Sequence, residues 1–560
     1  MTSSESGPTI RVRVGESSLE VPRGTLAADV LAQAGAFGPE VVAATVDNHL
    51  YDLATPLASS ATVAPVDQAR ATGRRVLSLS ARYLFLAAAE RAAPDVEVSI
   101  GPSLPSGQRF RVRDEEGVLI VGKALEDLAG KLERSIASLV DADLRFESQL
   151  LSLDAAEALL GPGHPSRERL LAAWPEATVP VLTLGSYHDL KYGVVARSTG
   201  RVGALQVTAV ENGLIVRWPE ETPVQLGEDD HHLLRITNIH RAWNRQVGVA
   251  TIGDLNHHIL YGDIEDCIRI TEARHERDLA NIAALIAEKR ETVRIVTLAG
   301  PSSAGKTTTV RRLSLQLKVA GIEPVIIGLD DYYRDRVDCP RDESGEYDFE
   351  ALEALDLALL QHHLAALQRG EEVRVPHFDF KNERPASKET WRPLVLEPQQ
   401  ILLIEGIHGL NPELTRELPQ ESCFRLYVNA VSPPDRDHQH RMHTTDLRLL
   451  RRIIRDRRYR GTMAAETIER WPSVRRGEER HIFPHAHRAH ATFDSSLVFE
   501  LGVLKTFAWR YLLEVPRSHP SRVRAHGLLE LLTPIVPILP DAVPSTSLLR
   551  EFIGGSTFRY

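Results

Sequence analysis

Cysteine and long apolar runs are both scarce in this chain of 560 residues. Its three cysteines, Cys267, Cys339 and Cys423, lie far apart, so they form neither a disulfide framework nor a thiolate zinc site. No stretch approaches the roughly 18 uninterrupted apolar residues of a membrane span. The first residues also lack the basic and apolar parts of a signal peptide. We therefore expect a cytoplasmic protein without membrane contact.

An excess of positive charge is missing too. The net charge of −10 and the pI near 6.1 argue against broad electrostatic binding of nucleic acid, and they leave room only for a local basic patch. The hydrophobic content of 43% and the charged content of 25% are ordinary for globular proteins. At roughly 150 residues per domain, the length predicts about three to four domains.

The most informative motif is a glycine-framed loop that matches the pattern G-x-x-x-x-G-K-[ST]. An apolar stretch rich in β-branched residues, Val293–Ala299, precedes it, and a helical pattern follows. This order of strand, loop and helix is the context in which such a loop binds phosphate. The loop consists of Gly300, Pro301, Ser302, Ser303, Ala304, Gly305, Lys306, Thr307 and Thr308.

A nucleoside triphosphate carries several negative charges, which aligned N–H dipoles and a cation can hold in one place. Gly300 and Gly305 allow the backbone to approach the phosphates, and the helix N-terminus faces them. Lys306 is placed to reach the β and γ oxygens, and the Thr307 hydroxyl is placed to bind Mg²⁺. We therefore expect this loop to bind ATP together with Mg²⁺.

Two acidic residues follow predicted buried strands. Pro324–Leu329 leads to Asp330, and Ile401–Ile404 leads to Glu405, so both carboxylates lie at the sheet edge where ligands bind in α/β folds. We expect Asp330 to act as general base or to contact the metal, and Glu405 to bind Mg²⁺ directly or through water. The alternatives are that Asp330 caps the next helix and that Glu405 belongs to a turn.

A basic amphipathic helix is expected between Arg448 and Arg460. Arginines on a mobile lid can neutralise charge on a transferring phosphoryl group, and we assign this task to Arg452 and Arg455. For the other arginines of this stretch we expect a solvated surface. A nucleic-acid-binding helix is the alternative for the stretch as a whole.

With these motifs in register, residues from about 294 to 515 resemble the uridine kinase and phosphoribulokinase group of P-loop kinases. The matching pieces are the glycine-framed loop, Leu329–Tyr333, Glu346–Glu350, Pro376–Phe380, Ile404–Ile407 and Arg451–Asp456. The resemblance implies a mostly parallel sheet, with Asp330 as the catalytic aspartate and Glu405 as the metal-linked glutamate. It further implies that Glu350 lies near the ribose hydroxyls and that the nucleoside pocket contains Tyr333, Phe378 and Phe380.

The chain departs from the uridine kinase pattern beside this pocket. After Phe380 it continues Lys381-Asn382-Glu383-Arg384, without the histidine that pyrimidine-specific members place against the base. Glu350 stands where those members have an aspartate. The identity of the accepted base therefore stays open.

The first part of the chain resembles the small β-grasp TGS domain. Strands are expected at Ile10–Val14, Ser18–Val21, Val41–Val46 and in the Leu50–Leu57 region. A helix is expected from Thr25 to Ala34, with Thr25 as its cap and Gly35 as its stop.

The next segment resembles the N-terminal half of threonyl-tRNA synthetase, through the helix Leu79–Ala92 and the stretch Asp189–Gly200. That family has four metal ligands at an editing site. The matching positions here are Leu79, Tyr83, Lys191 and Val195, which are unsuited to hold a divalent ion, so we expect no editing activity. Four histidines do not suggest a replacement site, because we expect them solvated or hydrogen-bonded in and beside loops: His188, His231, His232 and His240.

These observations predict a multidomain protein that combines α/β and α+β architecture. The expected parts are a TGS-like domain over 1–70, a synthetase-like α+β module over 71–245, a helical connector over 246–290, a P-loop kinase domain over 291–515 and a helical appendage over 516–560. The connector ends in a helix whose inner face is expected to carry Leu279, Ile282, Leu285 and Ile286.

The sequence favours an ATP-dependent kinase that phosphorylates the 5′-hydroxyl of a small-molecule nucleoside. One alternative is a kinase of another ribosyl compound or of a sugar phosphate. Aromatic side chains such as Phe378 and Phe380 favour a planar base over a bare sugar. Another alternative is a nucleotide-gated regulatory protein whose N-terminal half binds RNA. The sequence leaves self-association into a homo-oligomer open.

Overall fold

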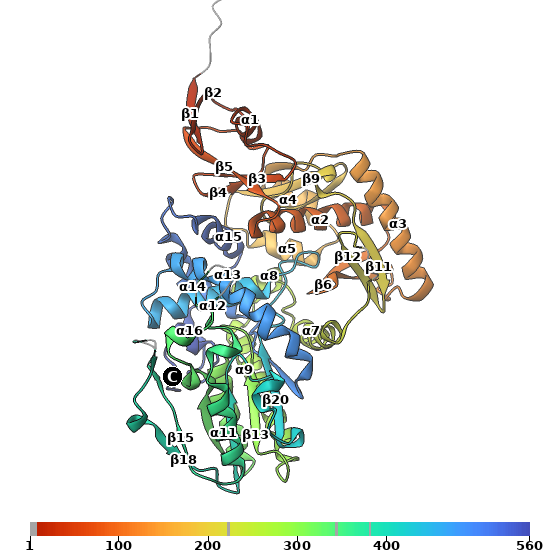
Figure 1. Ribbon diagram of the computed structural model, residues 1–560. Coiled ribbons are helices and arrows are strands. Elements are labelled where there is room, and N and C mark those ends of the chain that lie inside the picture. The colour runs from red at the N-terminus through yellow and green to blue at the C-terminus, as the bar shows by residue number, and fades with distance from the viewer. Residues whose placement is uncertain are drawn as a thin grey trace, which may run out of the picture.

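The computed structural model describes residues 8–220, 224–341, 345, 347–379, 382 and 384–559. The N-terminal sheet lies at one end of the molecule and a parallel sheet lies at the other, with a helical layer between them (Figure 1). The described C-terminal end returns to the parallel sheet, close to α16 (Figure 1).

Five strands form the first sheet, in the order β2-β1-β5-β3-β4. Their bounds are β1 Thr9–Val14, β2 Ser17–Pro22, β3 Val41–Val46, β4 His49–Tyr51 and β5 Ala61–Asp67, with helix α1 at Ala27–Gln33. Every second side chain of β1 is buried, as expected for a strand with one face on a core. The predicted cap is wrong, because Leu26 occupies the N-cap position and the Thr25 hydroxyl donates to the Pro22 carbonyl. Strand β5 is an element that the sequence pattern did not reveal.

The next region places two antiparallel sheets around the long helix α2. The sheets have the orders β10-β9-β8 and β11-β12-β7-β6, and α2 contributes a run of buried side chains from Tyr83 to Ala89. The elements are α2 Ala71–Ala92, β6 Glu97–Leu104, β7 Gly107–Arg113, α3 Gly122–Asp141, β8 Glu147–Ser152, α4 Leu153–Leu160, α5 Pro165–Ala172, β9 Thr178–Leu184, β10 Tyr187–Leu190, α6 Thr199–Val202, β11 Gln206–Val210 and β12 Gly213–Arg217.

Three helices connect this region to the parallel sheet: α7 Glu228–Gln246, α8 Ile252–Tyr261 and α9 Ile264–Ala287. His231, His232 and His240 lie on α7 and His188 lies on β10, so the predicted loop position is wrong. The predicted hydrogen bonding is confirmed for His188 with Thr183 and for His240 with Arg274, and His232 is buried. On α9, three of the four predicted inner residues are buried, whereas Leu285 is exposed.

The parallel sheet has the strand order β14-β19-β13-β20-β21. All five residues of its central strand β13 are buried, as is typical of a parallel strand covered by helices on both faces. The strands are β13 Ile295–Ala299, β14 Glu323–Gly328, β19 Gln400–Glu405, β20 Cys423–Asn429 and β21 Ala491–Asp494. The helices around them are α10 Lys306–Val319, α11 Leu357–Gln368, α12 Thr444–Tyr459, α13 Ala464–His481 and α14 Glu500–Leu513. The predicted mostly parallel sheet is confirmed.

Short elements complete the chain. Strand β15 Val373–Val375 pairs with β18 Arg392–Leu394, and β16 Phe378–Asp379 pairs with β17 Arg384–Pro385. After α14 come α15 Arg522–Leu532 and α16 Arg550–Ile553, which share one hydrophobic core with β13. The C-terminal segment is thus part of the core of the parallel-sheet region. Among the described residues, no helix has the length and apolar composition needed to cross a membrane.

Candidate active site

The carboxyl ends of three neighbouring strands meet at one edge of the parallel sheet. Strand β19 lies between β13 and β14, and Glu405 is in register with Leu298 of β13 and Gly328 of β14. The glycine-framed loop follows β13 and Asp330 follows β14. Parallel pairing therefore brings together three motifs that are far apart in the sequence.

The glycine-framed loop has the backbone of an anion-binding nest. Ser303 and Gly305 both adopt left-handed conformations, with φ of 58° and 83°, which turn successive N–H groups toward one side. Gly300 is needed for packing, because a Cβ there would lie 2.0 Å from the carbonyl oxygen of Val428. The Lys306 ammonium donates to the Gly300 carbonyl at 2.9 Å, so the lysine lies across the loop.

Oxygen ligands suited to a hard cation lie directly beside the nest. The Thr307 hydroxyl donates to a carboxylate oxygen of Glu405 at 3.0 Å. Burial raises the pKa of Glu405 to about 7; Lys306 opposes this rise and the nearby charge of Asp330 adds to it. The single positive charge of Lys306 therefore does not balance the two carboxylates of Glu405 and Asp330. Hydroxyl and carboxylate oxygens around such charge fit Mg²⁺.

Asp330 lies in a short 3-10 turn, Leu329–Tyr332, that directly follows β14. Its side chain is exposed to solvent, although many protein atoms surround the carboxyl group and reduce its hydration. The resulting loss of hydration raises its pKa, against the attraction of Lys306. Gly328 occupies the N-cap of this turn, so the alternative of a helix-capping Asp330 is wrong. The neighbouring Asp331 turns elsewhere and lies 3.1 Å from the His377 ring.

An aromatic and acidic group lies next to Asp330. The ring of Tyr333 lies 5.6 Å from the ring of Phe378 and 6.5 Å from that of Phe349, centroid to centroid. Burial raises the pKa of Glu350 to about 7, opposed by Arg452. Burial raises the pKa of Tyr333, and the charges of Asp330 and Glu350 add to this rise, so these three residues lie near one another. Phe380, the third aromatic residue predicted for the nucleoside pocket, lies outside the described residues.

Helix α12 brings Arg452 and Arg455 to the same edge. Arg452 donates to the Ser302 hydroxyl at 2.7 Å and also pairs with Asp456. Arg455 pairs with Asp456, and its positive charge lowers the pKa of Asp330, although desolvation outweighs that effect. Both arginines of the prediction therefore face the site from α12.

The solvated surface predicted for the other arginines is wrong for Arg448 and Arg451, which are 1% and 0% exposed. Arg448 pairs with Glu478 and donates to the Ser302 carbonyl at 3.0 Å. Arg451 pairs with Glu500 and donates to the Ser303 carbonyl at 3.3 Å. These two arginines hold the loop through hydrogen bonds to its carbonyl groups. Their acidic partners follow 30 and 49 residues later, so helical periodicity gives no sign of them.

Glu478 is a further residue that the motifs did not reveal. Its carboxylate accepts from the Ser302 amide at 3.0 Å and bonds both Arg448 and Arg475. Burial opposes ionisation of this carboxyl, yet Arg448 and Arg475 hold its pKa below the usual range. The loop is therefore fixed by an ionised carboxylate as well as by arginines.

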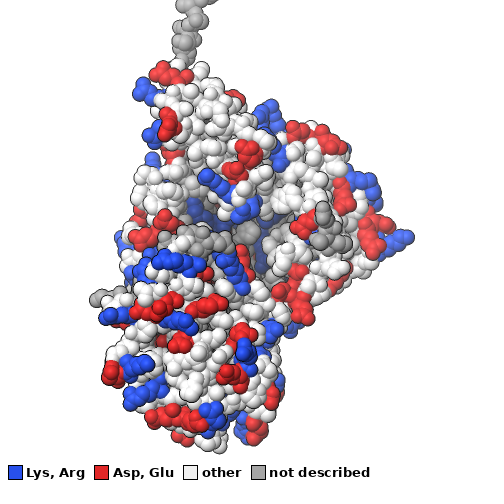
Figure 2. Space-filling model, viewed as in Figure 1, with Lys and Arg blue, Asp and Glu red and all other residues white. Residues whose placement is uncertain are grey.

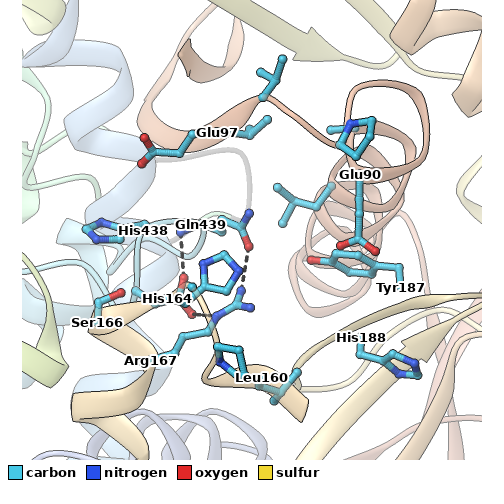
Figure 3. Close-up of a pocket in the computed structure, with 18 of the residues that line it drawn as sticks. Glu90, Glu97, Leu160, His164, Ser166, Arg167, Tyr187, His188, His438 and Gln439 are labelled. Atoms are coloured by element: carbon cyan, nitrogen blue, oxygen red, sulfur yellow. Dashed lines mark hydrogen bonds and ion pairs between the residues drawn. The ribbon is translucent and has the colours of Figure 1, made fainter. Parts of the chain in front are cut away.

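A cavity of about 750 Å³ lies where residues of the N-terminal part meet the segment before α12. Figure 3 shows Arg167, His164 and Gln439 together at its wall, with Glu90 and Tyr187 across from them. Arg167 contacts Asp189 at 2.6 Å and Gln439 at 2.7 Å, which joins the N-terminal part to the parallel-sheet region.

The four positions matched to synthetase metal ligands form ordinary packing and polar contacts. Tyr83 donates to the Leu190 carbonyl at 2.7 Å, Lys191 pairs with Asp52 at 2.5 Å, Val195 is buried and Leu79 packs against the same core. None of these contacts resembles metal ligation.

Comparison with known proteins identifies the parallel-sheet region. The Phosphoribulokinase / Uridine kinase family model matches residues 295–499. The uridine kinase of Staphylococcus epidermidis is 30% identical over 180 residues, which are 32% of this chain and 76% of that enzyme. The chain belongs to the phosphoribulokinase/uridine kinase family.

Other relatives align over a similar length. The uridine kinase of Bacillus pumilus is 33% identical over 181 residues, or 32% of this chain and 75% of that enzyme. A solved structure of a possible uridine kinase from Bacillus stearothermophilus is 18% identical, with a TM-score of 0.26, over 39% of this chain and 98% of the other. The family relationship therefore concerns the kinase region, and the first 294 residues lie outside the family match.

Proposed function

We propose that this protein is an ATP-dependent kinase that transfers the γ-phosphoryl group to the 5′-hydroxyl of a nucleoside. The observation that carries the proposal is the convergence of Lys306, Glu405 and Asp330 at one sheet edge, beside the Tyr333–Phe378 aromatic pair. Family membership supports phosphoryl transfer, and the uridine kinases among its relatives support a nucleoside acceptor.

Each residue of the site has a chemical task in this proposal. Asp330 accepts the proton of the acceptor hydroxyl, whose oxygen attacks the γ-phosphorus while the bond to the β-phosphate oxygen breaks and ADP leaves. Lys306 and Arg452 stabilise the negative charge on the phosphoryl oxygens. Mg²⁺ held by Thr307 and Glu405 would neutralise further phosphate charge. Positioning and electrostatics supply most of the rate in such transfers.

The acceptor pocket separates a nucleoside from a phosphorylated sugar. Tyr333 and Phe378 offer ring surfaces that suit a planar base, and Glu350 lies where a ribose hydroxyl can donate to it. Asp330 and Glu350 would repel the phosphate of a sugar phosphate acceptor bound directly beside them. Phosphorylation of a sugar phosphate is therefore the second candidate, favoured only by the phosphoribulokinase side of the family.

We also propose that residues 1–70 form a TGS-like β-grasp domain and that residues 71–245 form a threonyl-tRNA synthetase-like module without editing activity. The five-stranded sheet with one helix supports the first assignment, and the two sheets around α2 support the second. Such modules keep an RNA-binding regulatory protein as the other candidate function. Acidic and basic side chains are interspersed over the face in Figure 2, which does not favour a broad nucleic-acid interface.

Product identification tests the proposed function directly. The protein is incubated with ATP, Mg²⁺ and a panel of nucleosides, ribosyl compounds and sugar phosphates, and the phosphorylated product is identified by mass. We expect a nucleoside 5′-monophosphate. ATP consumption only with sugar phosphates would move the assignment to the second candidate. Salt-dependent tRNA binding without any phosphorylated product would favour the RNA-binding candidate.

A further inference from the structure

The C-terminal strap, which we define as residues Ser547–Gly554, lies against the phosphate loop although it follows the family-matched region by almost fifty residues. Helix α16 within this strap lies beside α12 (Figure 1). We propose that Glu551 of the strap is a positioning residue that holds the first turn of α10 in the geometry needed for triphosphate binding. This inference rests on the proposed kinase function.

One carboxylate oxygen of Glu551 receives two donors from Thr308. The Thr308 amide donates to it at 3.2 Å and the Thr308 hydroxyl at 2.6 Å. Thr308 is the third residue of α10, and the first amides of a helix have no acceptor within the helix itself. A carboxylate at this end also interacts favourably with the helix dipole. Glu551 therefore caps the phosphate-binding helix from a distant part of the chain.

The strap is a fixed part of the core. Its apolar side chains are 2% exposed or less, and they belong to the same hydrophobic cluster as Val296 and Leu298 of β13. These side chains are Leu548, Leu549, Phe552 and Ile553. The strap also reaches the loop itself, since a Cβ on Gly305 would lie 2.7 Å from Leu548. Removing the strap would take these four large apolar side chains out of the shared core.

A second contact joins the strap to the arginine helix. The ring of Phe552 lies 5.2 Å from the guanidinium of Arg451, which donates to the Ser303 carbonyl in the loop. Glu551 thus holds α10, which carries Lys306, while Phe552 packs on α12, which carries Arg452. The strap fixes the relative position of the two helices that bring positive charge to the phosphates.

The hydrogen bonds between Glu551 and Thr308 allow a second role for Glu551, in which it competes with the nucleotide. A carboxylate that accepts from an amide and a hydroxyl of the phosphate loop occupies an anion position, and a nucleotide phosphate prefers the same donors. If Glu551 competed with the nucleotide, its removal would strengthen nucleotide binding. If it positions α10, its removal weakens nucleotide binding. The sign of the effect separates these two roles.

The test compares Glu551→Ala with Glu551→Gln in the full-length chain, with Asp541→Asn as a control at an exposed carboxylate of the same C-terminal segment. The readouts are KM for ATP, kcat, the dissociation constant for ADP and the thermal unfolding midpoint. We expect Glu551→Ala to raise KM for ATP and the ADP dissociation constant about tenfold or more. Glu551→Gln keeps an oxygen that accepts from Thr308, so it should remain within about threefold of the unaltered protein.

Each other outcome overturns the proposal. Tighter nucleotide binding by both variants would show competition, and a lower unfolding midpoint at unchanged affinity would show a purely structural role. If Glu551→Ala does not fold, Glu551→Asp replaces it, because the shorter side chain draws the carboxylate away from Thr308. ADP binding is measured without an acceptor. The test of Glu551 therefore stands even if no nucleoside is phosphorylated and the proposed function fails.

Discussion

Two groups of ionisable side chains in this protein have carboxyl pKa values shifted in opposite directions. At the candidate active site, Asp330, Glu350 and Glu405 have raised pKa values, because loss of hydration outweighs the nearby cations. At the junction with the N-terminal part, burial would also raise the pKa of Asp437, but His440 and Arg167 hold it well below its usual range. The cations near the first group do not offset its loss of hydration, whereas Arg167 and His440 do so in the second group.

This difference in nearby positive charge distinguishes a structural group from one suited to bind ligands. Asp189, Asp437 and His440 approach one another closely enough to suggest metal ligands, yet Arg167 already supplies the positive charge there. That group is a buried junction between two parts of the chain. The carboxylates of the active site instead fit a cation and a substrate that arrive from solution. Four experiments test whether the two groups differ in this way.

The largest effect should come from Asp330→Asn. Loss of the group that accepts the hydroxyl proton is expected to lower kcat by roughly 10²–10⁴-fold, with little change in the ADP dissociation constant. Steady-state kinetics and calorimetry measure the two quantities. The control is Asp331→Asn, because that adjacent carboxylate faces His377. Similar losses in both variants would remove Asp330 from the role of base.

Removal of Arg167 should strongly destabilise the junction. Arg167→Met leaves Asp189 and Asp437 buried with less positive charge, and breaking such a pair costs about 3–5 kcal/mol. Denaturant unfolding measures this loss. Arg169→Met is the matched control: the Arg169 side chain is 46% exposed beside Asp254, and an exposed pair contributes about 0–1 kcal/mol. Equal losses would contradict the view that Arg167 is the built-in cation.

Arg452→Ala should have an intermediate effect on turnover. The variant loses the contact to the Ser302 hydroxyl and a positive charge near the phosphates, so we expect kcat to fall by about 10–100-fold. Arg452→Lys keeps the charge without the planar fork and should recover part of the loss. Turnover at saturating ATP is the measurement. Unchanged turnover in Arg452→Ala would place the arginine outside the reaction.

The smallest effect is a pH-dependent gain in stability from Glu405→Gln. Because the folded state raises the pKa of Glu405 from 4.5 to about 7, folding favours the protonated form, and stability falls as the pH rises through this window. Glutamine does not titrate, so the variant does not lose stability in this way as the pH rises. Relative to the unaltered protein, it should gain on the order of 1–2 kcal/mol between pH 5 and pH 8, measured without Mg²⁺ or nucleotide. A difference in unfolding free energy that is constant with pH would refute the expectation.

The sequence predicted the elements whose signals are local. The glycine-framed loop, the strands that lead to Asp330 and Glu405, and the basic helix appear close to the predicted positions, because β-branched runs and helical periodicity depend on neighbouring residues. The sheet strands β3 and β13 were likewise recognisable. Strand β5 was missed, since Ala61–Asp67 includes a proline and does not strictly alternate apolar and polar residues.

Residues that act through distant partners were out of reach of such patterns. Arg448 and Arg451 look like surface arginines on a charged helix, and only Glu478 and Glu500, 30 and 49 residues further on, make their burial favourable. Glu551 lies 243 residues from Thr308, in a segment for which the sequence suggested no role. Contacts between residues this far apart in the chain leave no trace in local periodicity.

Local sequence patterns were enough to predict a phosphate-binding loop at the end of a buried strand, with acidic residues after two further strands. A loop of glycines, lysine and threonine needs only its own backbone and the adjoining helix to define its chemistry. Only the folded chain shows which carboxylates lack enough nearby positive charge to offset their loss of hydration, and which are paired with a cation. Hydration, burial and the distance to a cation are properties of the packed chain, and they set the pKa of each group.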